Sequence, residues 1–133
     1  MLEKGESQNI AAVHRIYEFL STKNLPAMFE LLSPDIRITQ STELPWGGTY
    51  VGIPEAQMLL EKLWVYVDNR SEVNYVIDGG DRIAAIGCAH ITVGRTGRTF
   101  DVPFMHLWEF KEGLAVRLEI VSDVAAMRAA IGR

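Results

Sequence analysis

The chain of 133 residues lacks the features that mark several classes of protein. It has one cysteine, Cys88, so no intrachain disulfide can form, and a lone cysteine does not build a structural zinc site. No apolar run approaches the ~20 residues that a membrane helix needs. The N-terminus, MLEKGESQNIAAV, has no apolar stretch of the kind found in signal peptides. We therefore expect a cytoplasmic protein with no membrane partner.

Basic residues are also too few for a nucleic-acid binder. Lysine and arginine total 13 against 17 aspartates and glutamates, which gives a formal net charge of −4. The basic residues are dispersed along the chain, whereas proteins that bind phosphate backbones carry a basic surface. We expect no nucleic-acid partner.

Motifs for metals and phosphates are missing as well. The three histidines show neither HxH nor HExxH spacing, so no metal site is predicted. Gly47-Gly48 lacks the GxxxxGK[ST] pattern of a phosphate loop. We expect no cofactor.

What remains is the pattern of one α+β domain spanning residues 1–133. Apolar residues recur at three- and four-residue steps from about Ser7 to Ser21, which predicts a helix. Further helices are predicted over 26–32 and over 54–67, each begun by a proline, with a short strand at 36–39 and a glycine-rich loop over 43–52.

The second half of the chain predicts a sheet. Apolar and β-branched runs at 72–77, 82–93, 99–110 and 115–121 are separated by DGGD, GRTG and KEG turns, which is typical of an antiparallel meander. Pro103 lies inside a strand and predicts a bulge or an edge. A last helix is predicted over 124–131. A curved antiparallel sheet packed on the N-terminal helices would enclose a pocket.

Several segments resemble the SnoaL-like branch of the nuclear-transport-factor-two-like superfamily, which includes ketosteroid isomerase. They are the first helix ending at Leu20 with Lys23-Asn24 behind it, LLSPDIRI, GTYVGIPEA and TFDVPFMHLWEFKEGLAVRLEIVSD. The resemblance covers about Ile10 to Gly132. It implies a cone-shaped α+β fold and a homodimer formed through the outer sheet face. Members include isomerases, cyclases, hydrolases, dehydratases and pure binders, so the fold does not give the function.

The match to ketosteroid isomerase fails at the catalytic positions. That enzyme needs a carboxylate base, a tyrosine and a protonated aspartic acid. Matching by motif puts the tyrosine position on Ile16, beside Tyr17, the base near Gln40 and the acid on Met105. Steroid isomerisation by that mechanism is therefore not expected.

Asp123, His106 and His90 are the candidate catalytic residues. SnoaL-like cyclases resemble this chain in using an aspartate late in the sheet as acid/base, and an apolar cavity would raise the pKa of such a carboxyl group. The alternative is that Ser122 or Asp123 caps the last helix. His106 or His90 would partner Asp123, or would be a hydrogen-bonded core or interface residue.

Tyr17, Trp46, Tyr50 and Met105 are the candidate ligand-binding residues. Trp46 lies in the glycine-rich loop and would close the pocket mouth, while Met105 is predicted to face the interior. Together these features predict a homodimer with a pocket for a hydrophobic small molecule. Its function would be isomerase-, cyclase- or dehydratase-type acid/base catalysis, or non-catalytic binding with the same fold.

Overall fold

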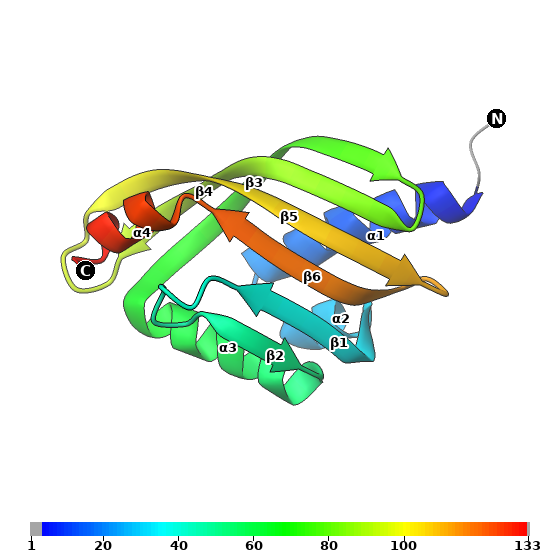
Figure 1. Ribbon diagram of the computed structural model, residues 1–133, viewed down its shortest axis with the longest axis horizontal. Coiled ribbons are helices and arrows are strands. Elements are labelled where there is room, and N and C mark those ends of the chain that lie inside the picture. Colours follow the sequence, from blue (N-terminus) through cyan, green and yellow to red (C-terminus); the bar gives the residue numbers. More distant parts are fainter. Residues whose placement is uncertain (1–3, 133) are drawn as a thin grey trace.

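The computed structural model describes residues 4–132, which form four helices and a six-stranded sheet (Figure 1). The α+β prediction is confirmed. The helices are α1 (Lys4–Ser21), α2 (Leu25–Phe29), α3 (Ile53–Tyr66) and α4 (Val124–Ala130). The strands are β1 (Leu32–Gln40), β2 (Gly48–Val51), β3 (Val67–Gly79), β4 (Arg82–Val93), β5 (Thr99–Lys111) and β6 (Leu114–Ser122).

The sheet is curved and unclosed, with the strand order β2-β1-β6-β5-β4-β3. Neighbouring strands are antiparallel except β1 and β6, which are parallel. Helix α3 contacts β1, β2 and β3, so it spans the gap between the two ends of the sheet (Figure 1). Helix α1 packs on β3 and β4. No helix within the described residues is long and apolar enough to cross a bilayer.

The largest differences from the predicted boundaries lie in β1, β2 and β3. Ser33-Pro34-Asp35, which precede the predicted strand at 36–39, lie inside β1, where the pairing with β6 shifts register between Leu32 and Arg37. Part of the glycine-rich loop forms β2, which pairs with β1. Strand β3 starts at Val67, five residues before the predicted start.

The register shift between the long strands β3 and β4 lies next to a glycine, Gly87. A Cβ atom on Gly87 would lie 1.8 Å from the backbone oxygen of Glu72, so only glycine permits this approach of β3 and β4. The register of this pair shifts next to it, between Val73 and Tyr75.

Of the two alternatives predicted at Pro103, a bulge and an edge, the bulge is wrong. The β4–β5 register runs without a shift through the pair Cys88 and Pro103. The carbonyl oxygen of Pro103 accepts from the amide of Asp123, at 3.3 Å, just beyond the end of β6. In an antiparallel strand the N and O of one residue point to the same side. The donor that proline lacks therefore falls where β6 has already ended.

The core lies between the concave face of the sheet and helices α1 and α3. Alternate residues of β5, among them Val102, Phe104 and Trp108, point into it and are buried. On α1, Val13, Ile16 and Tyr17 are buried, as their helical spacing predicts.

Met105 faces outward, which corrects its predicted place in the pocket. It pairs with Ile86 on one side and Val121 on the other, and it does not line the cavity described below. The charged residues of β5, Asp101, Glu109 and Lys111, fall on the same alternation phase as Met105. A strand buries one phase toward the core. The side of β5 that carries the charged residues therefore faces outward, and Met105 lies on that side.

Candidate functional site

An internal cavity of about 130 Å³ lies between α1, α3 and the concave face of the sheet. Most of the side chains that line it are apolar. The polar ones among the described lining residues carry no full charge at neutral pH; they are Tyr17, Gln40, Asn69, Ser71, His106, Trp108 and Ser122. No Asp, Glu, Lys or Arg occurs in that lining.

Three of these polar side chains form one hydrogen-bonded chain. The Oη atom of Tyr17 lies 2.5 Å from Nδ1 of His106. The indole Nε1–H of Trp108 donates to the same Oη atom at 3.1 Å. Tyr17 comes from the buried stripe of α1, whereas the other two residues are two positions apart on the inward phase of β5. The helix and the strand therefore each supply part of the site.

The direction of these hydrogen bonds follows from the donors available. Indole N–H can only donate, so the Tyr17 oxygen accepts from Trp108. Burial of the Tyr17 ring raises the pKa of its hydroxyl, so it stays protonated. Its only hydrogen-bond acceptor among the described residues is Nδ1 of His106. This assigns the remaining imidazole proton to Nε2.

His106 is neutral at physiological pH. Burial lowers the pKa of its imidazole to about 3, because an apolar environment disfavours the charged form. The ring of Phe104 stacks on the imidazole with ring centres 4.1 Å apart, whereas the ring of Tyr17 lies beside it, with ring centres 5.8 Å apart and nearly parallel planes. Phe104 thus covers one face of the imidazole, and Tyr17 meets its Nδ1 edge.

The Nε2 atom of His106 is available to a ligand. Within residues 4–132 it makes no hydrogen bond, and no fully buried side-chain nitrogen or oxygen there lacks a partner. Nε2 therefore keeps accessible surface. Since His106 lines the cavity, that surface faces the cavity. The site presents one N–H donor to a molecule inside.

Asp123 does not lie in this site. It is the N-cap of α4, and its Oδ1 atom accepts from the amide of Ala126 at 3.0 Å. Its side chain is exposed and does not line the cavity, although its neighbours Ser122 and Met127 do. The structure therefore favours the capping alternative over the acid/base role predicted from the resemblance.

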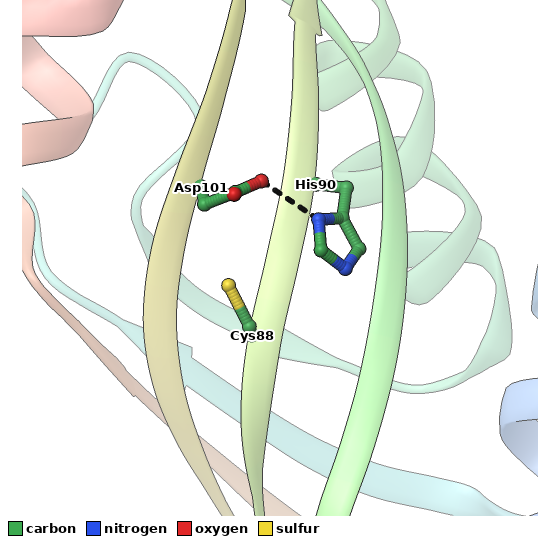
Figure 2. Close-up of side chains that lie close together, drawn as sticks. All are labelled: Cys88, His90 and Asp101. Carbon is green, nitrogen blue, oxygen red and sulfur yellow. Dashed lines mark hydrogen bonds and ion pairs between the residues drawn. The ribbon is translucent and has the colours of Figure 1, made fainter.

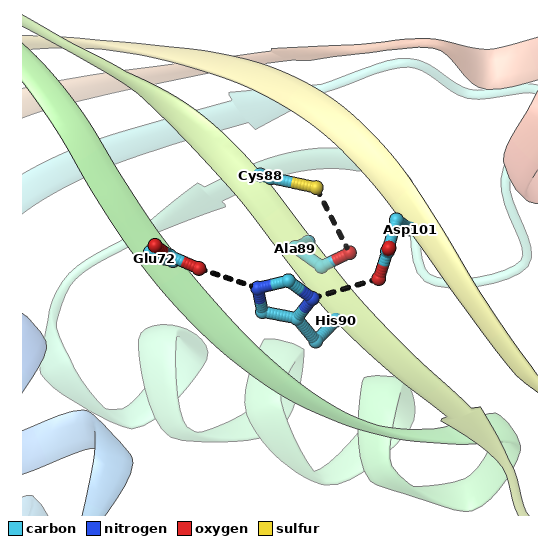
Figure 3. Close-up of polar contacts among 5 residues, drawn as sticks. All are labelled: Glu72, Cys88, Ala89, His90 and Asp101. Carbon is cyan, nitrogen blue, oxygen red and sulfur yellow. Dashed lines mark hydrogen bonds and ion pairs between the residues drawn. The ribbon is translucent and has the colours of Figure 1, made fainter.

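His90 does not lie in the cavity either. It points to the outer face of the sheet, where its Nδ1 atom lies 2.7 Å from Oδ1 of Asp101 (Figure 2). Its Nε2 atom lies 2.7 Å from Oε1 of Glu72 (Figure 3). These hydrogen bonds, that to Glu72 first, raise the pKa of His90. The two histidines thus occupy opposite faces, and a dyad of His90 with Asp123 does not form.

The same outer cluster bears on the predicted absence of a metal site. That prediction rests on the spacing of the histidines and on the presence of a single cysteine. The fold brings the thiol of Cys88 close to His90 and Asp101, with one potential ligand atom from each residue within 4.8 Å of the others. Cavity and cluster are separate, because the cluster residues do not line the cavity.

The two aromatic residues of the loop have different roles. Trp46 lines the cavity, as predicted, but it is 1% exposed and so forms part of the wall. Tyr50 is buried beside the cavity and does not line it; its hydroxyl donates to the carbonyl oxygen of Trp46 at 2.8 Å. A Cβ atom on Gly47 would lie 1.7 Å from the backbone oxygen of Ser41, so glycine is required where this loop packs. Tyr50 and Gly47 hold Trp46 in place.

Trp108 is the residue of the site that sequence reasoning missed. The signal was present, because Phe104, His106 and Trp108 share one phase of β5 and the charged residues share the other. Gln40 does line the cavity, at the position where the resemblance places the base of a ketosteroid isomerase. An amide cannot serve as that base.

The amino-acid sequence identifies the family. A family model described as a SnoaL-like domain matches residues 13–118. The chain belongs to the SnoaL-like domain family. A search among curated proteins returns no match.

Solved structures agree with this family. An NTF2-like protein of unknown function from Burkholderia pseudomallei is 29% identical over 95% of this chain and 98% of its own, with a TM-score of 0.90. TerC, co-crystallised with polyporic acid, is 22% identical over 95% of this chain and 99% of its own, with a TM-score of 0.89. A proposed SnoaL-like polyketide cyclase from Jannaschia sp. CCS1 is 19% identical, covering 98% and 96%, with a TM-score of 0.82. The two less similar structures share the fold alone.

Proposed function

We propose that this SnoaL-like protein binds a hydrophobic or aromatic small molecule in its cavity and that His106 supports acid/base chemistry on an oxygen atom of that ligand. The observation that carries the proposal is the chain from Trp108 through Tyr17 to His106, enclosed by apolar side chains. The reaction would be of the isomerase, cyclase or dehydratase type. Apart from water, which takes up the proton, it would need no chemical group beyond the side chains of this protein.

The size of the cavity limits the ligand. A cavity of about 130 Å³ is close to the roughly 150 Å³ of an engineered apolar cavity that takes up benzene. A ligand with one ring therefore fits without rearrangement. A larger ligand requires wall residues such as Trp46 to move.

The chemistry follows from a neutral imidazole with its proton on Nε2. This N–H donates to a carbonyl or hydroxyl oxygen and stabilises the negative charge that develops there when the ligand enolises. Tyr17 keeps the proton on Nε2 by donating to Nδ1. No carboxylate lines the described cavity, so the proton that leaves carbon passes to water. The account therefore favours ligands with an acidic C–H bond, such as 1,3-dicarbonyl compounds.

The structural relatives support a small-molecule role for this fold. TerC was co-crystallised with polyporic acid, and another relative is a proposed polyketide cyclase. Their low identity to this chain does not transfer a ligand or a reaction. The ligand class proposed above therefore rests on the cavity.

Non-catalytic binding in the same cavity is the second candidate. The observation that favours it is the absence of a charged side chain from the described lining, which leaves His106 without a strong base beside it. In that case His106 would select an oxygen-bearing ligand and would not accelerate its conversion.

We also propose that the protein forms a homodimer through the apolar part of the outer sheet face. Tyr75 and Ile77 are 69% and 59% exposed there, and Leu107 and Val121 are 36% and 42% exposed. Together with Met105 they make a continuous apolar surface across β3 to β6, as the strand register requires. Such patches mark interaction sites. A two-fold axis brings the same surface of two copies together, so the apolar surface of one copy would be covered by that of the other.

A pair of one-ring probes tests the ligand-binding step. Acetophenone has a carbonyl oxygen that ethylbenzene lacks, while the two molecules are similar in size. One hydrogen bond from Nε2 contributes about 1 kcal/mol, so the wild type should bind acetophenone roughly fivefold more tightly. In His106→Phe the carbonyl oxygen has no donor, so the preference for acetophenone should be lost or reversed. His14→Phe, changed on the exposed side of α1, should behave as the wild type. An unchanged preference in His106→Phe would contradict the proposal.

Deuterium exchange then separates catalysis from binding. The methyl hydrogens of acetophenone exchange slowly with deuterated water near neutral pH, and proton NMR follows them. Faster exchange with the wild type than with His106→Phe supports the enzyme. A His106-dependent affinity without faster exchange supports the binding protein.

A further inference from the structure

A cluster of metal-ligand side chains occupies the polar end of the outer sheet face. Cys88 and His90 are two positions apart on β4 and point to the same side (Figure 2). Asp101 is the register partner of His90 on β5, and Glu72 is the partner of Cys88 on β3. Register partners on one face have Cβ atoms about 4.5–5.5 Å apart. The sheet itself therefore brings four potential ligand side chains from three strands together.

The donor atoms already lie close to the separation that zinc requires. The Sγ atom of Cys88, a ring nitrogen of His90 and a carboxylate oxygen of Asp101 all lie within 4.8 Å of one another. Zinc bonds of about 2.0–2.3 Å in a tetrahedral site place ligand atoms roughly 3.3–3.7 Å apart. The side chain of Asp101 is 70% exposed, so it has room to rotate and close this gap.

We propose that Cys88 Sγ, His90 Nδ1 and one carboxylate oxygen of Asp101 form a binding site for a zinc ion. A thiolate, an imidazole and a carboxylate are the donor types that Zn²⁺ combines in proteins. The cluster faces outward, so water fills the fourth position. Proton loss from Nδ1 and Sγ to solvent accompanies binding, because both atoms must offer a lone pair.

Glu72 completes the site as a positioning residue. Its Oε1 atom lies 2.7 Å from Nε2 of His90, on the far side of the ring from Asp101 (Figure 3). Metal-binding histidines usually donate their other N–H to a carboxylate, which fixes the ring and its tautomer. Here the ring is already turned so that Nδ1 faces Asp101. Glu72 therefore holds the histidine in the orientation that zinc needs.

Charge supports a cation at this position. Glu72 and Asp101 carry two negative charges, and a Cys88 thiolate in the zinc-bound protein would add a third. Without metal, the imidazolium of His90 and the guanidinium of Arg70, the register partner of His90 on β3, offset part of this charge. In the metal-free protein the Cys88 thiol donates weakly to the carbonyl oxygen of Ala89, at 3.9 Å (Figure 3). Burial first, and then the charges of Asp101 and Glu72, raise the pKa of this thiol. A divalent cation reverses that effect by binding the thiolate.

Cobalt and zinc titrations of the full chain test this site. The protein is freed of metal with a chelator and titrated with CoCl₂, whose thiolate charge-transfer band and visible d–d bands report sulfur ligation and tetrahedral geometry. ZnCl₂ added afterwards should remove both signals at one equivalent. Calorimetry then gives the zinc affinity of each variant.

Cys88→Ser should remove the charge-transfer band, and both Cys88→Ser and His90→Gln should weaken zinc binding by at least about 100-fold. Glu72→Gln should weaken it by roughly 10- to 100-fold, as positioning residues do. The double variant His14→Gln/Asp81→Asn, whose exposed residues lie outside the cluster, is the control and should bind as the wild type. Thermal unfolding without metal confirms that each variant folds. A wild-type cobalt complex without the thiolate band, or equal zinc affinities of the wild type and Cys88→Ser, would overturn the proposal.

Discussion

Tyr17 and His106 are separated by 89 positions in the chain, and their side chains meet with 2.5 Å between Oη and Nδ1. The contact joins α1 to β5 across the cavity. It sets the tautomer of the imidazole and ties the helix to the sheet. The proposed ligand binding and the expected stability and pH dependence all involve this pair.

Tyr17→Phe should destabilise the protein by about 1–3 kcal/mol. The change removes the hydrogen bond to His106 and leaves the buried Nε1–H of Trp108 without its acceptor. Urea unfolding measures the loss. Thr92→Val is the control, because the side chain of Thr92 is exposed and lies outside the proposed dimer surface, so its change should cost less than about 0.5 kcal/mol. Equal effects in the two variants would show that the Tyr17 hydroxyl contributes nothing.

Stability should fall as pH drops below the ordinary pKa of histidine. The unfolded chain takes up a proton on His106 near pH 6.5, whereas the folded protein, with a pKa of about 3, does not. The unfolded state then binds more protons, so this residue lowers the free energy of unfolding by up to about 1.4 kcal/mol per pH unit between these two values. Above about pH 6.5 the effect is absent.

Comparison with a histidine variant isolates this contribution. From pH 7 to pH 5 the wild type should lose about 2 kcal/mol more stability than His106→Gln. His14→Gln, on the exposed side of α1, should match the wild type at both pH values. A wild type and a His106→Gln variant with parallel pH profiles would mean that the folded imidazole titrates normally.

Asp123→Asn should be silent and Asp123→Ala should cost about 1 kcal/mol, because Asn is an equally good N-cap and Ala is not. The cap bond to Ala126 is the basis of this expectation. Thermal or urea unfolding gives both values. In the deuterium-exchange assay, Asp123→Asn should keep the wild-type rate. Loss of exchange in a folded Asp123→Asn protein would restore the acid/base role that the structure disfavours.

Ile77→Lys should convert the proposed dimer to a monomer, since it places a charge in the apolar outer face. Light scattering should give the wild type twice the chain mass of 14.9 kDa and the variant that mass once. Val65→Lys changes an apolar residue on α3 that is more exposed than Ile77, at 77%, and should leave the mass of the wild type. A monomeric wild type at micromolar concentration would end the dimer proposal.

The sequence predicted the fold well because the fold depends on periodicity and turns. The helical stripe of α1 and the turns between the last four strands follow from local residue types. The charged residues Asp101, Glu109 and Lys111 also indicate which side of β5 faces solvent. Met105 shares their alternation phase and so lies on that side too, but it was predicted to face the core. Apolar residues on both phases of β5 obscured the difference between core and outer surface.

The site was harder to predict because its contacts are long-range. Tyr17 and His106 were each candidates, but their direct bond depends on how α1 lies across the sheet. Asp123 was predicted as acid/base because it is a carboxylate late in the sheet, whereas its position is explained by its role as the N-cap of α4. The cluster of Cys88, His90 and Asp101 depends on the β4–β5 register, which single-residue spacing does not contain.

The protonation of His106 is the central claim, and ¹⁵N NMR of the imidazole nitrogens measures it most directly. We predict a neutral ring with the proton on Nε2, unchanged from pH 7 to pH 5, and an Nε2 shift that responds when acetophenone is added. A His106 ring that titrates near pH 6.5, or that carries its proton on Nδ1, would contradict the account.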